Sequence, residues 1–425
     1  MTDPSGADPS GLDLPWIDRA LVAARPQAMG ALLRYFRDLD LAEEAFQDAC
    51  LRALRTWPEQ GPPRDPAAWL IFVGRNSALD GVRRRSRQTP LPPEDELSDL
   101  GDAEQALAER LDGGEYRDDI LRLLFICCHP DLPATQQIAL ALRIVCGLSV
   151  PRIARAFLVG EAAMEQRITR AKARIAAARV PFEAPGAPGR ADRLAAVAAM
   201  IYLLFNEGYS ATGSEIAARA PLADEAIRLA RLLLRLFPAE PEIMGLAALL
   251  LLQHARAAAR FDAEGGVVLL EEQDRRLWNR TMIAEGLALL DKALRHRRRG
   301  PYQVQAAIAA LHARAARPED TDWVQIERLY AALETLQPSP VVTLNRAVAV
   351  AKVAGPAAAL AMVEPLAGPL AGYFHFFGLR GWLHRELGDA AAARADFGRA
   401  IALANSAAEA DHIRRHLDRL DRGGG

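Results

Sequence analysis

Residues 41–54 read LAEEAFQDACLRAL, and this stretch decides the fold class. Its apolar side chains recur every three or four residues, which is the spacing of one face of an α-helix. That face comprises Phe46, Ala49, Cys50, Ala53, Leu54 and Trp57. The opposite face comprises Glu43, Glu44, Gln47, Asp48, Arg52 and Arg55. The pattern leaves open whether this polar face is merely solvated or binds a partner.

The remainder of the chain has the same helical character. The 425 residues are 51% hydrophobic but only 6% aromatic, and Ala, Leu and Arg dominate, a mix that favours helix over strand. No segment shows a convincing period-two alternation of apolar and polar residues. We therefore predict an all-α protein with several domains.

Composition divides the chain into helical regions and linkers. Residues 1–15 are rich in Pro, Gly and Asp and are predicted to be disordered. Two linkers are predicted from their Pro-rich sequences, at 88–115, which is also acidic, and at 181–190. The helical regions are then 16–87, 116–180 and 191–425.

Charge and cysteine content exclude several classes of protein. The net charge of −2 and the pI near 6.5 conceal local asymmetry, so charge has to be considered segment by segment. No apolar run is long enough for a membrane span and no secretory signal is evident, so we expect a cytoplasmic protein with no membrane partner. Cys127-Cys128-His129 lacks a CxxC pair to complete a metal site, so buried, reduced thiols are favoured and neither metal nor cofactor is expected.

A second helix, predicted from Asp65 to Arg87, runs from an aromatic start to a basic end. Asp65 can cap it and Pro66 suits its first turn. One side carries Trp69, Val73, Asn76, Asp80, Arg83 and Arg87, and residues 83–87 read RRRSR. Arginines neutralise phosphates, and aromatic and amide groups can bind an unstacked base. A core Trp with a basic helix end that answers the helix dipole explains the same residues.

Residues 132–179 predict two short helices joined by a tight turn to a third. Gly147 can end the first, Ser149 can cap the second, and the third begins at Glu161. The third helix has a buried stripe of Met164, Ile168, Ala171 and Ile175 and an outer side of Ala163, Gln166, Arg167, Arg170 and Arg174. This is typical of a helix-turn-helix, with Ala163 and Gln166 at base edges and Arg170, Lys172 and Arg174 at phosphates. A helical hairpin with a charged face also fits.

These two modules resemble a known family. The stretch at 41–54, Ala68-Trp69-Leu70, Ala78-Leu79-Asp80 and Arg83-Arg84-Arg85 resemble region 2 of the extracytoplasmic-function (ECF) RNA polymerase sigma factors. Gly147-Leu148-Ser149, Ile153-Ala154 and residues 167–172 (RITRAK) resemble region 4 of the same family, in the same order along the chain.

The resemblance implies partners and roles for these residues. Core RNA polymerase would be bound through the β′ clamp helices and the β flap, with Glu43, Glu44, Gln47 and Asp48 facing the clamp helices. Region 2 would recognise and melt the −10 promoter element through Trp69, Asn76, Asp80, Arg83, Arg84, Arg85 and Arg87. Region 4 would bind the −35 element through Ala163, Gln166, Arg167, Arg170, Lys172 and Arg174.

The extension beyond residue 190 contains a repeat of 34 residues. Ala313, Ala347 and Gly381 show this spacing, as do Ile326, Leu360 and Arg394. A period of 34 with paired helices is the tetratricopeptide (TPR) signature, and stacked pairs leave a concave surface for a partner. Residues 203–209 (LLFNEGY), 271–275 (EEQDR), 300–303 (GPYQ) and 338–342 (PSPVV) resemble an ECF subgroup with a fused TPR-like extension. In that subgroup the extension replaces a separate membrane anti-sigma factor as regulator, and its partner would be intramolecular or another protein.

Two rival functions fit parts of the pattern. A conventional helix-turn-helix regulator would bind duplex DNA without polymerase, and a TPR scaffold would bind only protein. The polar clusters at 206–209 and 271–274 match no H-E-x-x-H, P-loop or nucleophile-elbow pattern, so we predict that the protein is not an enzyme.

Overall fold

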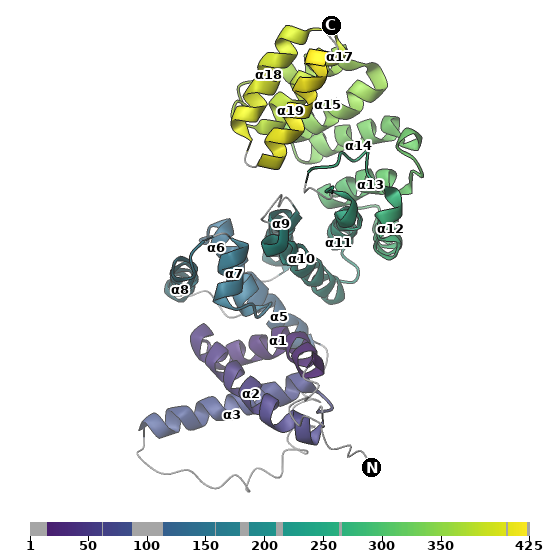
Figure 1. Ribbon diagram of the computed structural model, residues 1–425. Helices are drawn as coiled ribbons and strands as arrows, with labels where there is room; N and C mark the ends of the chain where they lie inside the picture. The colour runs from purple at the N-terminus through teal and green to yellow at the C-terminus, as the bar shows by residue number, and fades with distance from the viewer. Residues whose placement is uncertain are drawn as a thin grey trace, which may run out of the picture. The chain divides into compact units, whose positions relative to one another are not determined.

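A computed structural model describes residues 15–61, 63–86, 114–157, 159–178, 187–209, 216–262, 266–404 and 407–422. In these ranges the chain is helical, and the only β-structure is an isolated bridge between Phe261 and Val267. The prediction of an all-α protein is therefore confirmed. The chain forms two compact units, residues 1–200 and 201–425 (Figure 1).

Three mutually packed helices begin the first unit: α1 (Pro15–Phe36), α2 (Leu39–Gln60) and α3 (Pro66–Ser86). Asp38 starts α2, because its side chain accepts a hydrogen bond from the Leu41 amide at 2.9 Å. The apolar face predicted for α2 is largely buried, with Phe46 and Trp57 each 2% exposed. Leu54 is the exception, since it is exposed to solvent.

Local sequence fixes the start of α3 and its distance from α2. Asp65 accepts hydrogen bonds from the amides of Ala67 and Ala68 at 2.9 and 3.1 Å, which confirms it as the cap. At Gly74 a Cβ atom would lie only 2.8 Å from the Ala45 carbonyl oxygen, so glycine permits the close approach of the two helices.

Four further helices complete most of the first unit: α5 (Gly114–Cys127), α6 (Ala134–Ile144), α7 (Val150–Ala156) and α8 (Glu161–Ala177). Helix α5 packs against α1, while α8 packs on α6 and α7. The predicted stripe of α8 is buried, and Gly147 has the positive φ of 76° that a turn after α6 requires. Ser149 occupies the cap position of α7 but makes no capping bond with its side chain.

The second unit begins within α9 (Ala187–Tyr209). This helix corrects one boundary, because its first turn lies inside the linker predicted at 181–190. Pro188 is tolerated there, since the first turn of a helix does not use its amides in internal bonds. Helix α10 (Ile216–Leu236) then leads to α11 (Pro241–His254), which is buried almost throughout and packs against α12 (Arg280–Arg295) and α13 (Pro301–Arg314).

The remaining helices form successive packed pairs. They are α14 (Trp323–Leu336), α15 (Pro340–Ala354), α16 (Pro356–Val363), α17 (Phe374–Glu386), α18 (Ala390–Leu403) and α19 (Ala407–Arg422), with short 3-10 turns at Ala257–Ala259, Arg275–Leu277, Pro318–Asp320 and Glu364–Leu366. The small residues spaced by 34, Ala313, Ala347 and Gly381, are buried on α13, α15 and α17. At Gly381 a Cβ atom would lie 2.7 Å from the Phe397 ring of α18, so this position needs glycine for close packing.

Candidate polymerase and nucleic-acid interface

The four acidic and amide residues assigned to polymerase binding differ in exposure. Glu44 and Gln47 point to solvent on α2, whereas Asp48 is half-buried and accepts a hydrogen bond from the Ser77 hydroxyl at 2.8 Å. Glu43 is only 5% exposed. The structure therefore exposes Glu44 and Gln47, although the Gln47 amide donates a hydrogen bond to the Glu43 carboxylate at 3.4 Å, and holds the other two against neighbouring elements.

Glu43 is enclosed by cations from the second helical module. Its carboxylate lies 2.6 Å from an Arg143 guanidinium nitrogen of α6 and 2.8 Å from the Lys172 ammonium of α8. Lys172 also binds Asp40, at 2.6 Å. Partial burial alone would lower the pKa of Lys172, but the bonds to Asp40 and Glu43 outweigh it and raise this pKa above its usual value.

Arg25 of α1 supports the same contact, although nothing in the spacing of the sequence predicts this role. Its guanidinium donates hydrogen bonds to the carbonyl oxygens of Ile144 at 2.9 Å and Arg143 at 3.1 Å, at the end of α6. It also lies 4.7 Å from the centre of the Phe46 ring. A cation is favoured at this position because the carbonyl end of a helix carries partial negative charge.

The residues assigned to the −10 element lie on α3, apart from Arg87. Trp69 is half-buried and its ring meets the Trp57 ring edge-on, with the centroids 5.3 Å apart. Asn76 is also half-buried. The side chains of Asp80, Arg83, Arg84 and Arg85, and all of Arg87, lie outside the described part of the chain. Trp69 therefore has a core contact as well as an accessible portion.

The residues assigned to the −35 element lie on α8 and divide into two groups. Ala163, Gln166 and Arg170 are exposed and Arg167 is partly exposed, as the helical spacing predicts for an outer face. Arg174 is exposed too, although it donates a hydrogen bond to the Asp131 carbonyl oxygen at 3.1 Å. Lys172 instead turns toward α2. Its position four residues after the buried Ile168, at the edge of the stripe, was the one signal for this orientation.

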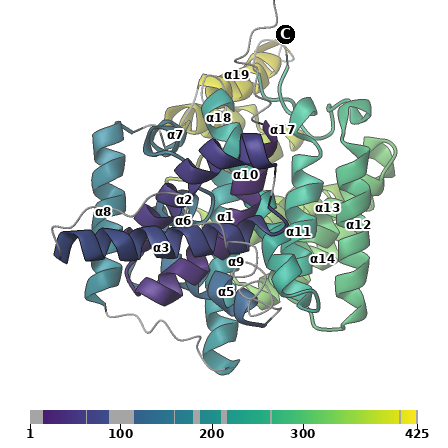
Figure 2. The same ribbon diagram turned by 90° about the horizontal axis from the view of Figure 1, so that it is seen from below.

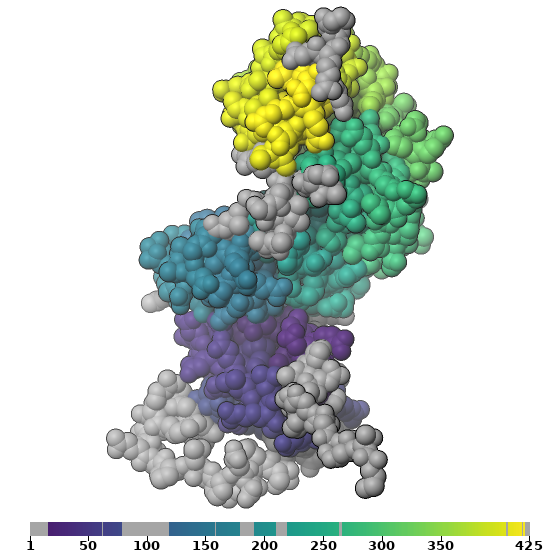
Figure 3. Space-filling view, viewed as in Figure 1, coloured from purple at the N-terminus to yellow at the C-terminus, as the bar shows by residue number. Residues whose placement is uncertain are grey.

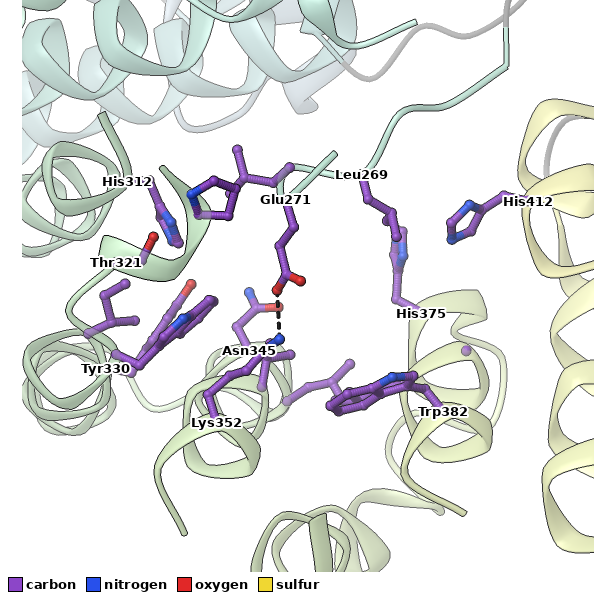
Figure 4. Close-up of a pocket in the computed structure, with 18 of the residues that line it drawn as sticks. Leu269, Glu271, His312, Thr321, Tyr330, Asn345, Lys352, His375, Trp382 and His412 are labelled. Carbon is purple, nitrogen blue, oxygen red and sulfur yellow. Dashed lines mark ion pairs between the residues drawn. The ribbon is translucent and has the colours of Figure 1, made fainter. Parts of the chain in front are cut away.

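The second unit contains a cavity of about 600 Å³. Figure 4 shows Tyr330 and His312 on one side of it and Trp382 on the other. The Glu271 carboxylate and the Lys352 ammonium form an ion pair of 2.8 Å between them. Burial and the nearby cations Arg256 and Arg275 lower the pKa of His312 to about 4, so its imidazole is neutral at pH 7. An aromatic cavity with a few polar groups is typical of a ligand site.

The polar clusters noted in the sequence serve structural contacts. Arg256 donates to the Tyr209 hydroxyl at 2.9 Å, and Gln273 donates to the Val268 carbonyl at 3.2 Å. Cys127, Cys128 and Cys146 are buried and Cys50 is half-buried. Among the described residues no group of three side chains could hold a metal ion, and none of the described helices is long and apolar enough to cross a bilayer.

Comparison with known proteins identifies both modules. Residues 21–88 match Sigma-70 region 2, residues 122–175 match Sigma-70, region 4, and residues 193–294 match a family of unknown function (DUF6596). A protein of Rhizobium meliloti (strain 1021), named Uncharacterized protein R00370, is 74% identical over 408 residues, which is 96% of each chain. No solved structure matches the chain.

The helical modules and the two matches define a transcription initiation factor. Its partners are core RNA polymerase and promoter DNA, and its role is in promoter-specific transcription. The chain belongs to the ECF-like sigma factors, in a form that carries a C-terminal extension.

Proposed function

We propose that region 2 (α1–α3) binds the β′ clamp helices and melts the −10 element, while region 4 (α5–α8) binds the β flap and the −35 element. The observation that supports this division most directly is the outer face of α8. There Ala163, Gln166 and Arg170 stand exposed beside one another on a helix of 17 residues, about 25 Å long. Small and amide side chains can approach base edges, and arginine holds phosphates.

Transcription in vitro tests this proposal. Purified core polymerase and the full chain are combined with the promoter upstream of the chain's own gene. A run-off product that depends on the chain is expected, because a sigma factor acts only together with core. A conventional helix-turn-helix regulator would instead bind duplex DNA without core, and a scaffold would bind neither core nor promoter. Failure of the chain to bind core in a pull-down would remove the sigma proposal.

We further propose that the protein is cytoplasmic and that its C-terminal extension is a TPR-like domain that regulates transcription initiation. The cavity lined by Tyr330 and Trp382 supports this role, because its size and aromatic lining suit a bound partner or ligand. Trp382→Ala in the full chain is expected to change promoter output in the run-off assay. Leu387→Ala, an exposed position at the end of α17, is the control and should leave output unchanged. Equal output from all three proteins would argue against a regulatory role for the cavity.

A further inference from the structure

The contact between region 2 (α1–α3) and helices α6–α8 of region 4 consists mainly of charges. Arg143 and Lys172 of region 4 meet Glu43 and Asp40 of region 2 in three ion pairs of 2.6 to 2.8 Å. In the space-filling view the surface of α6–α8 is continuous with that of α1–α3 (Figure 3). Within the described ranges, however, no helix of α1–α3 packs closely along a helix of α6–α8, unlike α5, which packs along α1. Charged side chains therefore contribute much of what joins α6–α8 to region 2.

This contact occupies a residue assigned to polymerase and a residue assigned to DNA. The Glu43 side chain is 6% exposed and the Lys172 side chain 16% exposed, so each is largely covered by the other's module. A carboxylate already bound by two cations cannot also meet a polymerase residue, and an ammonium between two carboxylates cannot neutralise a phosphate. Both groups become available only when the modules separate.

Promoter geometry demands the same separation. Elements named −35 and −10 lie about 25 base pairs apart, or roughly 85 Å at 3.4 Å per base pair. Helices α8 and α3, with 17 and 21 residues, are about 25 and 32 Å long. Two modules joined by ion pairs between α8 and α2 cannot reach both elements, and in Figure 2 the axis of α8 runs across that of α3. The 27 residues between α3 and α5, 87–113, are enough to span about 90 Å when fully extended, and a separation that uses them also releases α5 from α1.

We infer that Arg143 and Lys172, bound to Glu43 and Asp40, form an autoinhibitory latch that holds region 4 over region 2 until core polymerase or DNA competes for these charges. The inference rests on the proposed function, since it gives the regulation of the same surfaces. The latch can open from its exposed member: the Asp40 side chain is 76% exposed, and water can solvate it at once when Lys172 leaves. Core binding then includes the free energy of opening, so the apparent affinity is reduced by the closed fraction.

Two variants in the full chain weaken the latch without altering residues assigned to polymerase or DNA. Arg143→Glu places a negative charge against Glu43, and Asp40→Lys places a positive charge against Lys172. The second variant guards against a folding defect in the first, because Asp40 is exposed. Arg152→Glu on α7 is the matched control, since it makes the same charge change at an exposed position of region 4.

Two measurements are made on each protein. Affinity for core polymerase is measured in solution, and both latch variants are expected to bind about tenfold more tightly than the parent and the control. The distance between modules is measured by electron paramagnetic resonance, with spin labels at Arg55→Cys on α2 and Ala162→Cys on α8 in a Cys50→Ser background. A single narrow distance is expected for the parent and the control, and a longer, broader distribution for the latch variants.

The two measurements separate failure of the latch from failure of the polymerase proposal. Unchanged distances in both variants, or a parent that is already broad, would overturn the latch whatever the affinities. Longer distances without tighter core binding would show that the contact does not inhibit and would also overturn it. If the variants open but neither they nor the parent bind core at all, the ion pairs are shown to hold the modules together. The proposal that polymerase is the partner is then overturned.

Discussion

Glu43 and Lys172 bind each other across the two sigma regions, with 2.8 Å between the carboxylate oxygen and the ammonium nitrogen, although 128 residues lie between them in the chain. One belongs to the surface assigned to polymerase and the other to the surface assigned to DNA. A pair of this kind makes the availability of each surface depend on the other. The neighbouring residues that remain exposed can make the first contact with a partner while the pair is still formed.

Glu44 is the exposed acid on the polymerase face, and its reversal should weaken binding to core. Glu44→Lys is expected to lower the affinity of the full chain for core polymerase by at least about tenfold, or about 1.4 kcal/mol, since losing one partner of a hydrogen-bonded charge pair that an interface buries costs about 2–5 kcal/mol. Glu59→Lys, exposed farther along α2, is the control for the change of charge. Equal affinities for both variants and the parent would place the polymerase contact elsewhere.

Arg170 should contribute to promoter affinity through a phosphate. Arg170→Ala is expected to weaken binding of the holoenzyme to different promoters by a similar factor. It should also reduce the slope of log affinity against log salt by about 1, because one phosphate contact releases about one counterion. Arg19→Ala, exposed on α1, is the comparison. A loss confined to one promoter sequence, with the slope unchanged, would instead assign Arg170 to a base edge.

Gly74 should resist substitution because of its distance from α2. A Cβ atom at this position would lie 2.8 Å from the Ala45 carbonyl oxygen. Gly74→Ala gains helix propensity of about 1 kcal/mol but incurs an overpacking cost of about 1–3 kcal/mol, so a net loss of about 1 kcal/mol in local stability is expected. Hydrogen exchange of the α2 and α3 amides in the full chain measures it. Gly160→Ala, where no atom lies within 4 Å of the added Cβ, should leave exchange unaltered.

His312 should make the second unit less stable in acid. Its pKa is lowered to about 4 in the folded chain, from an unfolded value near 6.5, so the unfolded state binds the proton more readily. Its contribution is therefore complete above about pH 6.5 and is lost as pH falls toward 4, by up to about 3 kcal/mol.

Thermal melts of the full chain between pH 4.5 and 7.5 measure this loss. In the His312→Gln variant, the melting temperature of the second unit should depend less on pH, because glutamine does not titrate. The exposed His296→Gln should retain the parent's dependence. A parent and His312→Gln variant with the same pH profile would remove His312 as its source.

Local sequence was sufficient to predict those parts of the fold that local forces decide. The cap at Asp65, the buried stripe of α8 and the turn at Gly147 each depend on a few adjacent residues, and the structure confirms them. The predicted end of the linker at residue 190 was too late, because α9 begins at Ala187. Pro188 is compatible both with a linker and with the first turn of a helix.

The candidate site was predictable in composition but not in pairing. Helical spacing placed Gln166 and Arg170 on the outer face of α8, where they are found. It could not place Arg143 and Lys172 against Glu43, because a helical period says which residues share a face and nothing about which helix that face meets. Arg25 was missed for the same reason, since its partners are backbone carbonyls of a distant helix.

The thiols of the first unit determine how the protein responds to oxidants. Burial raises the pKa of Cys50 to about 11 and that of Cys128 to about 12, and raises that of Cys127 well above its usual value. A thiol with a pKa of about 11 is ionised at neutral pH in roughly one molecule in ten thousand, and the thiolate is the nucleophile that attacks peroxides and disulfides. These three cysteines therefore react slowly when the cell's redox balance shifts. A signal carried by peroxide would have to reach this factor through a partner rather than through these sulfur atoms.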